Sequence, residues 1–88
     1  MMNKRSLKKA INAVSDQLFV NAVAVSLYGN NSNAENDEAL INSIITMRED
    51  FVSRISHPEP GMKKQAYYKD LRDKFISQAQ EIADQISL

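Results

Sequence analysis

Residues 57–61 read His-Pro-Glu-Pro-Gly and hold both prolines and one of the two glycines of the 88-residue chain. A proline disrupts a helix interior and pushes the residue before it out of the helical region, so a helix that reaches this stretch ends near Ser56. The other glycine, Gly29, opens the stretch Gly-Asn-Asn-Ser-Asn at 29–33. These two breaks divide the chain into three segments of similar length.

Each segment carries apolar residues at the three- and four-residue spacing that places them on one face of a helix. The first segment has Leu7, Ile11, Val14, Leu18, Val25 and Tyr28, with Asn21 in one expected apolar position. The second has Leu40, Ile44, Met47, Phe51 and Ile55, widened by Ile41, Ile45 and Val52. The third has Tyr68, Leu71, Phe75, Ala79, Ile82 and Ile86. We therefore predict helices near 4–28, 33–56 and 60–87.

Residues at the breaks agree with these bounds. Gly29 can adopt the left-handed conformation that ends a helix, and Ser32 with Glu35 fits the capping box that starts one. Pro60 suits the first turn of the third helix, where the missing N–H has no partner to lose. Since short connections make neighbouring helices antiparallel, we predict an all-α, up-down-up three-helix bundle that forms a single domain over 1–88.

The composition excludes several classes of protein. Eleven basic and eleven acidic residues give a formal net charge of zero, so the chain as a whole is not a polycation that seeks nucleic acid or an anionic membrane. An apolar fraction of 43 % argues against disorder. The chain has no cysteine, which excludes a disulfide and a thiolate metal site and is compatible with a reducing cytosol.

The beginning of the sequence imitates a secretory signal, because four basic residues precede an apolar stretch. Asp16, Gln17 and Asn21 interrupt what would be the continuous apolar region of such a signal. No uninterrupted apolar run approaches the roughly 18 residues of a membrane span. We therefore expect a cytoplasmic protein with no membrane partner.

The stretch from Leu18 to Tyr28 is the least typical of a small bundle, because nine of its eleven residues are apolar. A helix that is apolar all round must be covered all round, and two neighbouring helices cover little more than one broad face. Phe19, Val23 and Leu27 are left without evident cover, and we predict that they form the contact face of a homodimer. The alternative is that the two other helices hide this surface within one chain.

Asn21 lies inside the same stretch and allows two interpretations. A buried asparagine can fix the register and oligomeric state of packed helices, at a cost in stability. Asn21 is then a register residue of the dimer. The alternative is that it lies at the edge of the contact and reaches solvent.

Charge is sorted along the predicted bundle although its sum is zero. Residues 1–14 and 46–75 share one end and carry six more basic than acidic residues, and the other end has the opposite excess, from Asp16, Glu35, Asp37, Glu38, Glu81 and Asp84. An anion site at the basic end, for nucleic acid or another polyanion, would use Lys4, Arg5, Lys8, Lys9, Lys63 and Lys64. The alternatives are solvated ends that only maintain solubility, or a head-to-tail contact between copies.

The sequence offers no recognisable catalytic or metal-binding constellation. The single histidine, His57, lies before a proline in a turn, with neither a second imidazole nor a thiol to complete a metal site. Two glycines are too few for a phosphate-binding loop. We predict no enzyme activity, no cofactor and no metal, and no motif points to a particular family. The favoured function is a non-enzymatic self-association or protein-interaction module, and the alternative is polyanion binding.

Overall fold

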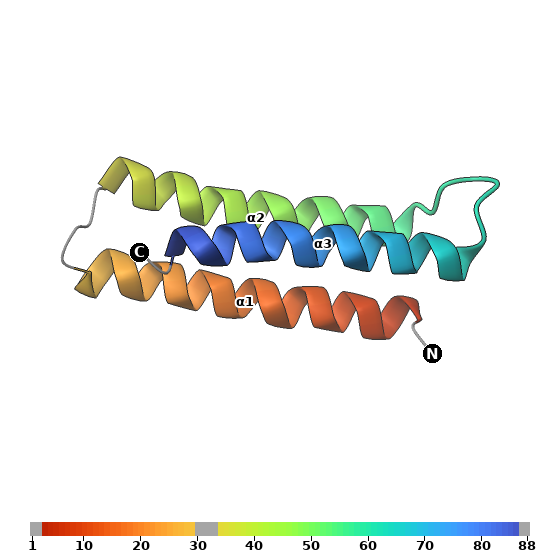
Figure 1. Ribbon diagram of the computed structural model, residues 1–88, viewed down its shortest axis with the longest axis horizontal. Helices are drawn as coiled ribbons and strands as arrows, with labels where there is room; N and C mark the ends of the chain where they lie inside the picture. The colour runs from red at the N-terminus through yellow and green to blue at the C-terminus, as the bar shows by residue number, and fades with distance from the viewer. Residues whose placement is uncertain (1–2, 30–33, 87–88) are drawn as a thin grey trace.

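The computed structural model of the chain describes residues 3–29 and 34–86. Helix α1 spans Lys4–Tyr28, α2 spans Ala34–Ser56 and α3 spans Lys64–Ile86, and the described residues contain no strand. Figure 1 shows the three helices side by side, with α2 running opposite to α1 and α3. The predicted up-down-up three-helix bundle is confirmed.

The bundle measures 48 × 21 × 16 Å. A helix with its side chains is about 10 Å wide, so this cross-section holds three helices around one core and no further layer. Every helix therefore keeps an outer side toward solvent. An apolar residue on such an outer side stays uncovered within one chain.

A reciprocal cap starts α1. Asn3 Oδ1 accepts a hydrogen bond from the Ser6 backbone N–H at 2.8 Å, and Ser6 Oγ accepts one from the Asn3 N–H at 3.3 Å. This capping box satisfies two of the donors that a helix start leaves unpaired. The predicted start at Lys4 is correct, although the prediction did not include this cap.

Gly29 ends α1 in an extended conformation, with φ −75° and ψ 147°, so the predicted left-handed cap is wrong. Its N–H donates a hydrogen bond to the Val25 carbonyl oxygen at 2.7 Å. A β-carbon on residue 29 would clash with that same oxygen. Glycine is needed here for a close approach of two backbone segments, and not for a positive φ.

Helix α2 begins at Ala34, one residue after the predicted start. Glu35 and Asp37 lie in its first turn, where negative charge interacts favourably with the helix dipole. Ser32, the predicted capping partner of Glu35, lies outside the described residues.

The connection between α2 and α3 corrects one predicted boundary. Gly61 has φ +86°, and the Met62 N–H donates to the Glu59 carbonyl oxygen at 3.4 Å. Proline followed by a glycine of positive φ is typical of a type II turn, so Pro60 opens a turn and not a helix. Helix α3 therefore begins at Lys64, four residues later than predicted.

The core runs along the common axis of the three helices. Phe51 of α2 lies at its centre, with no exposed surface, and its ring meets that of Phe75 of α3 edge to face at 5.3 Å between centroids. All six residues of the predicted α3 stripe are buried. From α2 the core takes Ile44, Met47, Phe51 and Ile55.

The side of α1 that faces the core matches the predicted stripe in part, at Leu7, Ile11 and Leu18. Its buried residues are Leu7, Ile11, Ser15, Leu18 and Ala22. Val14, Val25 and Tyr28, which the prediction placed in the core, are exposed. From Leu18 onward α1 is apolar on almost every side, so spacing cannot indicate which side faces inward. The small side chains of Ser15 and Ala22 occupy the inward positions and allow close packing.

The two ends of the bundle differ in charge. Figure 1 shows that one end holds the N-terminal part of α1, the C-terminal part of α2 and the beginning of α3. We call the other end the acidic end. Its acidic residues are Glu35, Asp37, Glu38, Glu81 and Asp84, and residues 17–29, 34–47 and 75–86 contain no lysine or arginine. Asp16, assigned to this end from the sequence, instead forms an ion pair with Arg48.

Candidate functional site

The three predicted contact residues follow one another along one side of α1 at intervals of four residues. Leu27 is 68 % exposed and Phe19 is 38 % exposed, whereas Val23 between them is partly buried. The other described residues therefore leave this ridge largely uncovered. The alternative in which α2 and α3 hide all three side chains does not describe the single chain.

A fourth apolar side chain extends this ridge onto α2. Ile45 is 40 % exposed and lines one groove together with Phe19, between the Ser15 side of α1 and the Arg48 side of α2. The prediction assigned Ile45 to the interior, as a widening of the α2 stripe. The sequence did contain a signal for this exposed position, because the apolar stripe of α2 is wider than the core requires. We call Phe19, Val23, Leu27 and Ile45 the seam face.

An ion pair forms the edge of the seam face. Arg48 Nη1 of α2 lies 3.4 Å from Asp16 Oδ1 of α1, and both side chains are about half exposed or more. In antiparallel helices this contact places Ile45 at the level of Phe19, and Ile41 at the level of Val23. The seam face is thus an apolar surface on two helices with a paired, electrically balanced edge.

Asn21 does not lie on the seam face of the single chain. It is exposed, and its Oδ1 accepts a hydrogen bond from Gln17 Nε2 of the same helix at 3.0 Å. The amide therefore has a partner without a second molecule. Its predicted role as a register residue stays a prediction, and the alternative, contact with solvent, describes Asn21 in this chain.

A second apolar groove lies on the opposite side of α1, against α3. It is lined by Val14, Leu18, Phe75, Ile76, Ala79, Gln80 and Ala83. Val14 and Ile76 are its most exposed apolar members, at 41 % and 44 %. None of these apolar lining residues is as exposed as Leu27.

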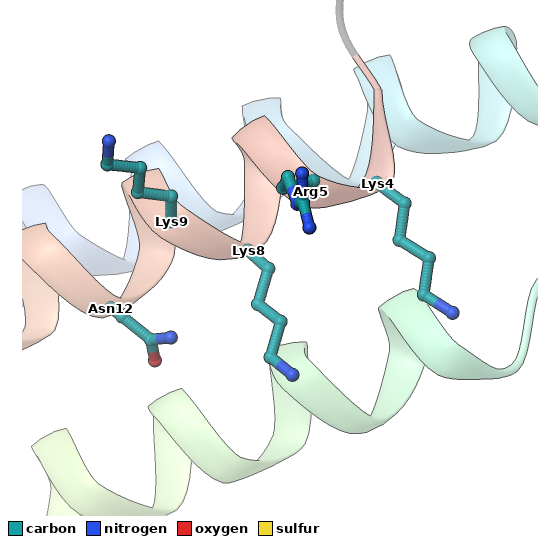
Figure 2. A pocket seen from close by; sticks show the side chains of 5 residues that line it. All are labelled: Lys4, Arg5, Lys8, Lys9 and Asn12. Atoms are coloured by element: carbon teal, nitrogen blue, oxygen red, sulfur yellow. The ribbon is translucent and has the colours of Figure 1, made fainter.

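Four of the six predicted anion-binding residues come together at the beginning of α1. Lys4, Arg5, Lys8 and Lys9 line a shallow depression with Asn12. Figure 2 shows the side chains of Lys4 and Lys8 extending toward α2 and that of Lys9 extending away from it. Diverging cations do not enclose one small anion. They can contact successive phosphates of an extended polyanion.

Lys63 and Lys64 do not join this depression. They lie at the beginning of α3, on the same end of the bundle but on another helix. Within residues 3–29 and 34–86, none of the six predicted cations forms an ion pair. The four cations of α1 therefore form a patch of unpaired positive charge, which we call the cationic end.

His57 is held at the end of α2 by contacts with Ser53 and Tyr67. Its Nδ1 lies 3.0 Å from the Ser53 carbonyl oxygen at the end of α2, and Tyr67 Oη lies 3.4 Å from the His57 carbonyl oxygen. In the part of the chain that the structure describes, no three histidine or acidic residues come together as metal ligands would.

Among the described helices, α1 is long and apolar enough to cross a membrane by length and composition. In its most apolar window 22 % of residues are buried within the bundle. Core helices of soluble proteins and signal sequences satisfy the same two criteria. These criteria average over a window of the helix, whereas Asp16, Gln17 and Asn21 interrupt the apolar residues within it.

Comparison with known proteins leaves the site to be interpreted from its own geometry. No family model, no curated protein and no solved structure matches the chain. The seam face and the cationic end are thus the two surfaces from which a function can be argued.

Proposed function

We propose that the chain is a non-enzymatic self-association module in which two copies pair through the seam face. The supporting observation is that exposed apolar side chains from two helices, Phe19 of α1 and Ile45 of α2, line the same groove. Leu27 continues this surface with the largest exposed fraction of the four residues. Contiguous exposed apolar surface of this kind marks interaction sites.

The energy available is modest. Complete burial of a large apolar side chain contributes about 1.5–3 kcal/mol, and the seam face residues are already partly covered within the chain. A symmetric dimer would bury four such side chains from each copy, against an association cost of about 4–15 kcal/mol. These magnitudes support a dimer that dissociates on dilution, and not an obligate one.

A matched pair of substitutions tests this proposal. Ile45 and Ile76 have the same side chain and almost the same exposure, but Ile45 belongs to the seam face and Ile76 to the groove between α1 and α3. In the proposed dimer, Ile45→Glu would place a charge in the contact, whereas Ile76→Glu would leave it in solvent. We expect I45E to be monomeric and I76E to dimerise like the wild type.

Sedimentation equilibrium of the two variants measures this difference, and circular dichroism verifies that both remain helical. If I76E dissociates and I45E does not, the contact lies at the other groove and the seam face is wrong. If both variants keep the wild-type mass, neither groove is the contact.

Polyanion binding is the second candidate function. It is favoured by the cationic end, where Lys4, Arg5, Lys8 and Lys9 lie together without ion pairs among the described residues. Binding of a short fluorescent DNA duplex should then weaken steeply with added salt, because each neutralised phosphate releases counterions. The double variant Lys8→Ala, Lys9→Ala should bind more weakly than Lys63→Ala, Lys64→Ala. A flat salt response would exclude this function.

A further inference from the structure

The two surfaces described above share one side of α1. Arg5, Lys9 and Asn12 precede Asp16, Phe19, Val23 and Leu27 at the three- and four-residue spacing of a single helix face. This face is cationic in its first half and apolar in its second half. A second copy that packs on the apolar half is longer than that half. The rest of its length therefore lies beside either the cationic half or the acidic end of the first copy.

We propose that two copies pair side by side and antiparallel, so that the cationic end of each copy lies beside the acidic end of its partner. The inference rests on the proposed self-association through the seam face and adds the orientation of the two copies. The partner is a second copy of this chain, recognised by an apolar centre with a complementary charge on either side.

The position of the apolar surface favours side-by-side packing. Phe19, Val23 and Ile45 lie along the sides of α1 and α2 and not at the ends of the rods. A head-to-tail contact through the charged ends would leave these side chains exposed. A dimer with a two-fold axis across the seam face covers them in both copies at once and closes on itself.

Charge then separates the two possible two-fold arrangements. A parallel pair would place four unpaired cations of one α1 beside the same four of the other, and five acidic residues beside five. An antiparallel pair places opposite charges together at both ends. Charges beyond a Debye length of about 8–10 Å are largely screened at moderate salt, so the register of the two copies decides whether the complementarity is effective.

The register that centres the apolar residues also brings the charges together. With the axis between the levels of Phe19 and Val23, Lys9 lies about 18 Å from the axis along α1, at about 1.5 Å per residue. The Asp16–Arg48 contact marks the register of α2 against α1, and in this register Glu35 lies about 12 Å from the axis, on the side that faces Lys9 of the other copy. The difference between these two distances from the axis is about the reach of a lysine side chain.

Single cysteines can measure the orientation, because the native chain has none. Ala10→Cys and Ala24→Cys place a spin label at exposed positions of α1 that belong to neither the seam face nor the cationic end. For an antiparallel dimer we expect a distance of about 33 Å or more between labels at position 10, and a much shorter distance at position 24. Similar short distances at both positions would show a parallel pair and overturn this inference. Self-association through the seam face would still hold in that case. Absence of dipolar coupling in both variants would show monomers and overturn the proposed function as well.

Charge reversal provides a second, independent test. Lys8→Glu with Lys9→Glu should weaken the homodimer about tenfold at low salt, because the two new carboxylates cancel the charge of Lys4 and Arg5 and lie beside the acidic end of the partner. Mixing this variant with Glu35→Lys, Glu38→Lys should restore pairing as a heterodimer. The weakening should disappear near 1 M salt, where the Debye length is about 3 Å. A reversed variant that dimerises like the wild type at low salt would contradict the antiparallel arrangement.

Discussion

Arg48 Nη1 of α2 lies 3.4 Å from Asp16 Oδ1 of α1, in the one ion pair that joins two helices within residues 3–29 and 34–86. The pair marks the level at which the antiparallel helices meet. One turn further along α1, Phe19 comes beside Ile45, and the two side chains line one groove. The apolar surface to which we assign the self-association is therefore a consequence of how α1 and α2 align.

Asp16→Asn should change stability only slightly. The side chains of Asp16 and Arg48 are 69 % and 47 % exposed, so water screens their attraction. Exposed pairs typically contribute about 0.2–1 kcal/mol to the free energy of unfolding. Urea denaturation should show a loss within that range and no loss of self-association. A loss above about 2 kcal/mol would mean that the pair, and not apolar packing, holds α1 against α2.

Ser15→Ala should stabilise the protein. Ser15 is 1 % exposed, and its Oγ has no hydrogen-bond partner, so burial of the hydroxyl opposes folding. Its removal should raise the free energy of unfolding by about 1 kcal/mol and the melting temperature by roughly 4–8 °C. Ser43→Ala is the control, because Ser43 is exposed and its hydroxyl already donates to the Ala39 carbonyl oxygen. A lower melting temperature for S15A would show that the hydroxyl is satisfied in solution.

Phe51→Ala should lower the free energy of unfolding by about 3–5 kcal/mol, since it leaves a cavity in the centre of the core. Phe51 contacts the Phe75 ring edge to face, and the Arg54 guanidinium carbon lies 5.1 Å from the centroid of its ring. Phe19→Ala is the matched control, measured by denaturation at a concentration where the protein is monomeric. Phe19 is partly exposed, so its replacement should lower the free energy of unfolding of the monomer much less. Equal losses for the two variants would contradict the assignment of Phe19 to the surface.

Tyr67→Phe should lower the free energy of unfolding by about 0.5–1.5 kcal/mol. Tyr67 Oη of α3 donates a hydrogen bond to the Arg54 carbonyl oxygen near the end of α2 at 2.9 Å, across the connection between the two helices. Tyr28→Phe removes the same hydroxyl from a residue that is 82 % exposed and should be neutral. Thermal denaturation of both variants makes the comparison, and an unchanged Y67F would mean that this bond contributes nothing to stability.

The fold was predictable because its signals are local. Residues at 29–33 and 57–61 interrupt the helical spacing, and α3 has one apolar face, so each of its core residues was identified correctly. The start of α3 was placed too early because Pro60 suits a helix start as well as a type II turn. Only the positive φ of Gly61 distinguishes the two.

The candidate site was harder to predict for a different physical reason. The second half of α1 is apolar on most sides, so its inward side depends on packing against α2 and α3. That packing buries Ser15 and Ala22 and exposes Val14 and Val25. Ile45 was missed in the same way, because a sequence pattern does not separate a core residue from an apolar residue beside the core.

The mass of the native chain in solution, measured by light scattering over a range of concentrations, tests the central claim most directly. We expect a rise from 9.9 kDa toward about twice that value as concentration increases, and a constant 9.9 kDa for the folded Val23→Glu variant. Leu27→Glu, at the most exposed position of the seam face, should behave in the same way without disturbing the core. A native chain that stays at 9.9 kDa at every concentration would contradict self-association. Variants that keep a dimer's mass would contradict its assignment to the seam face.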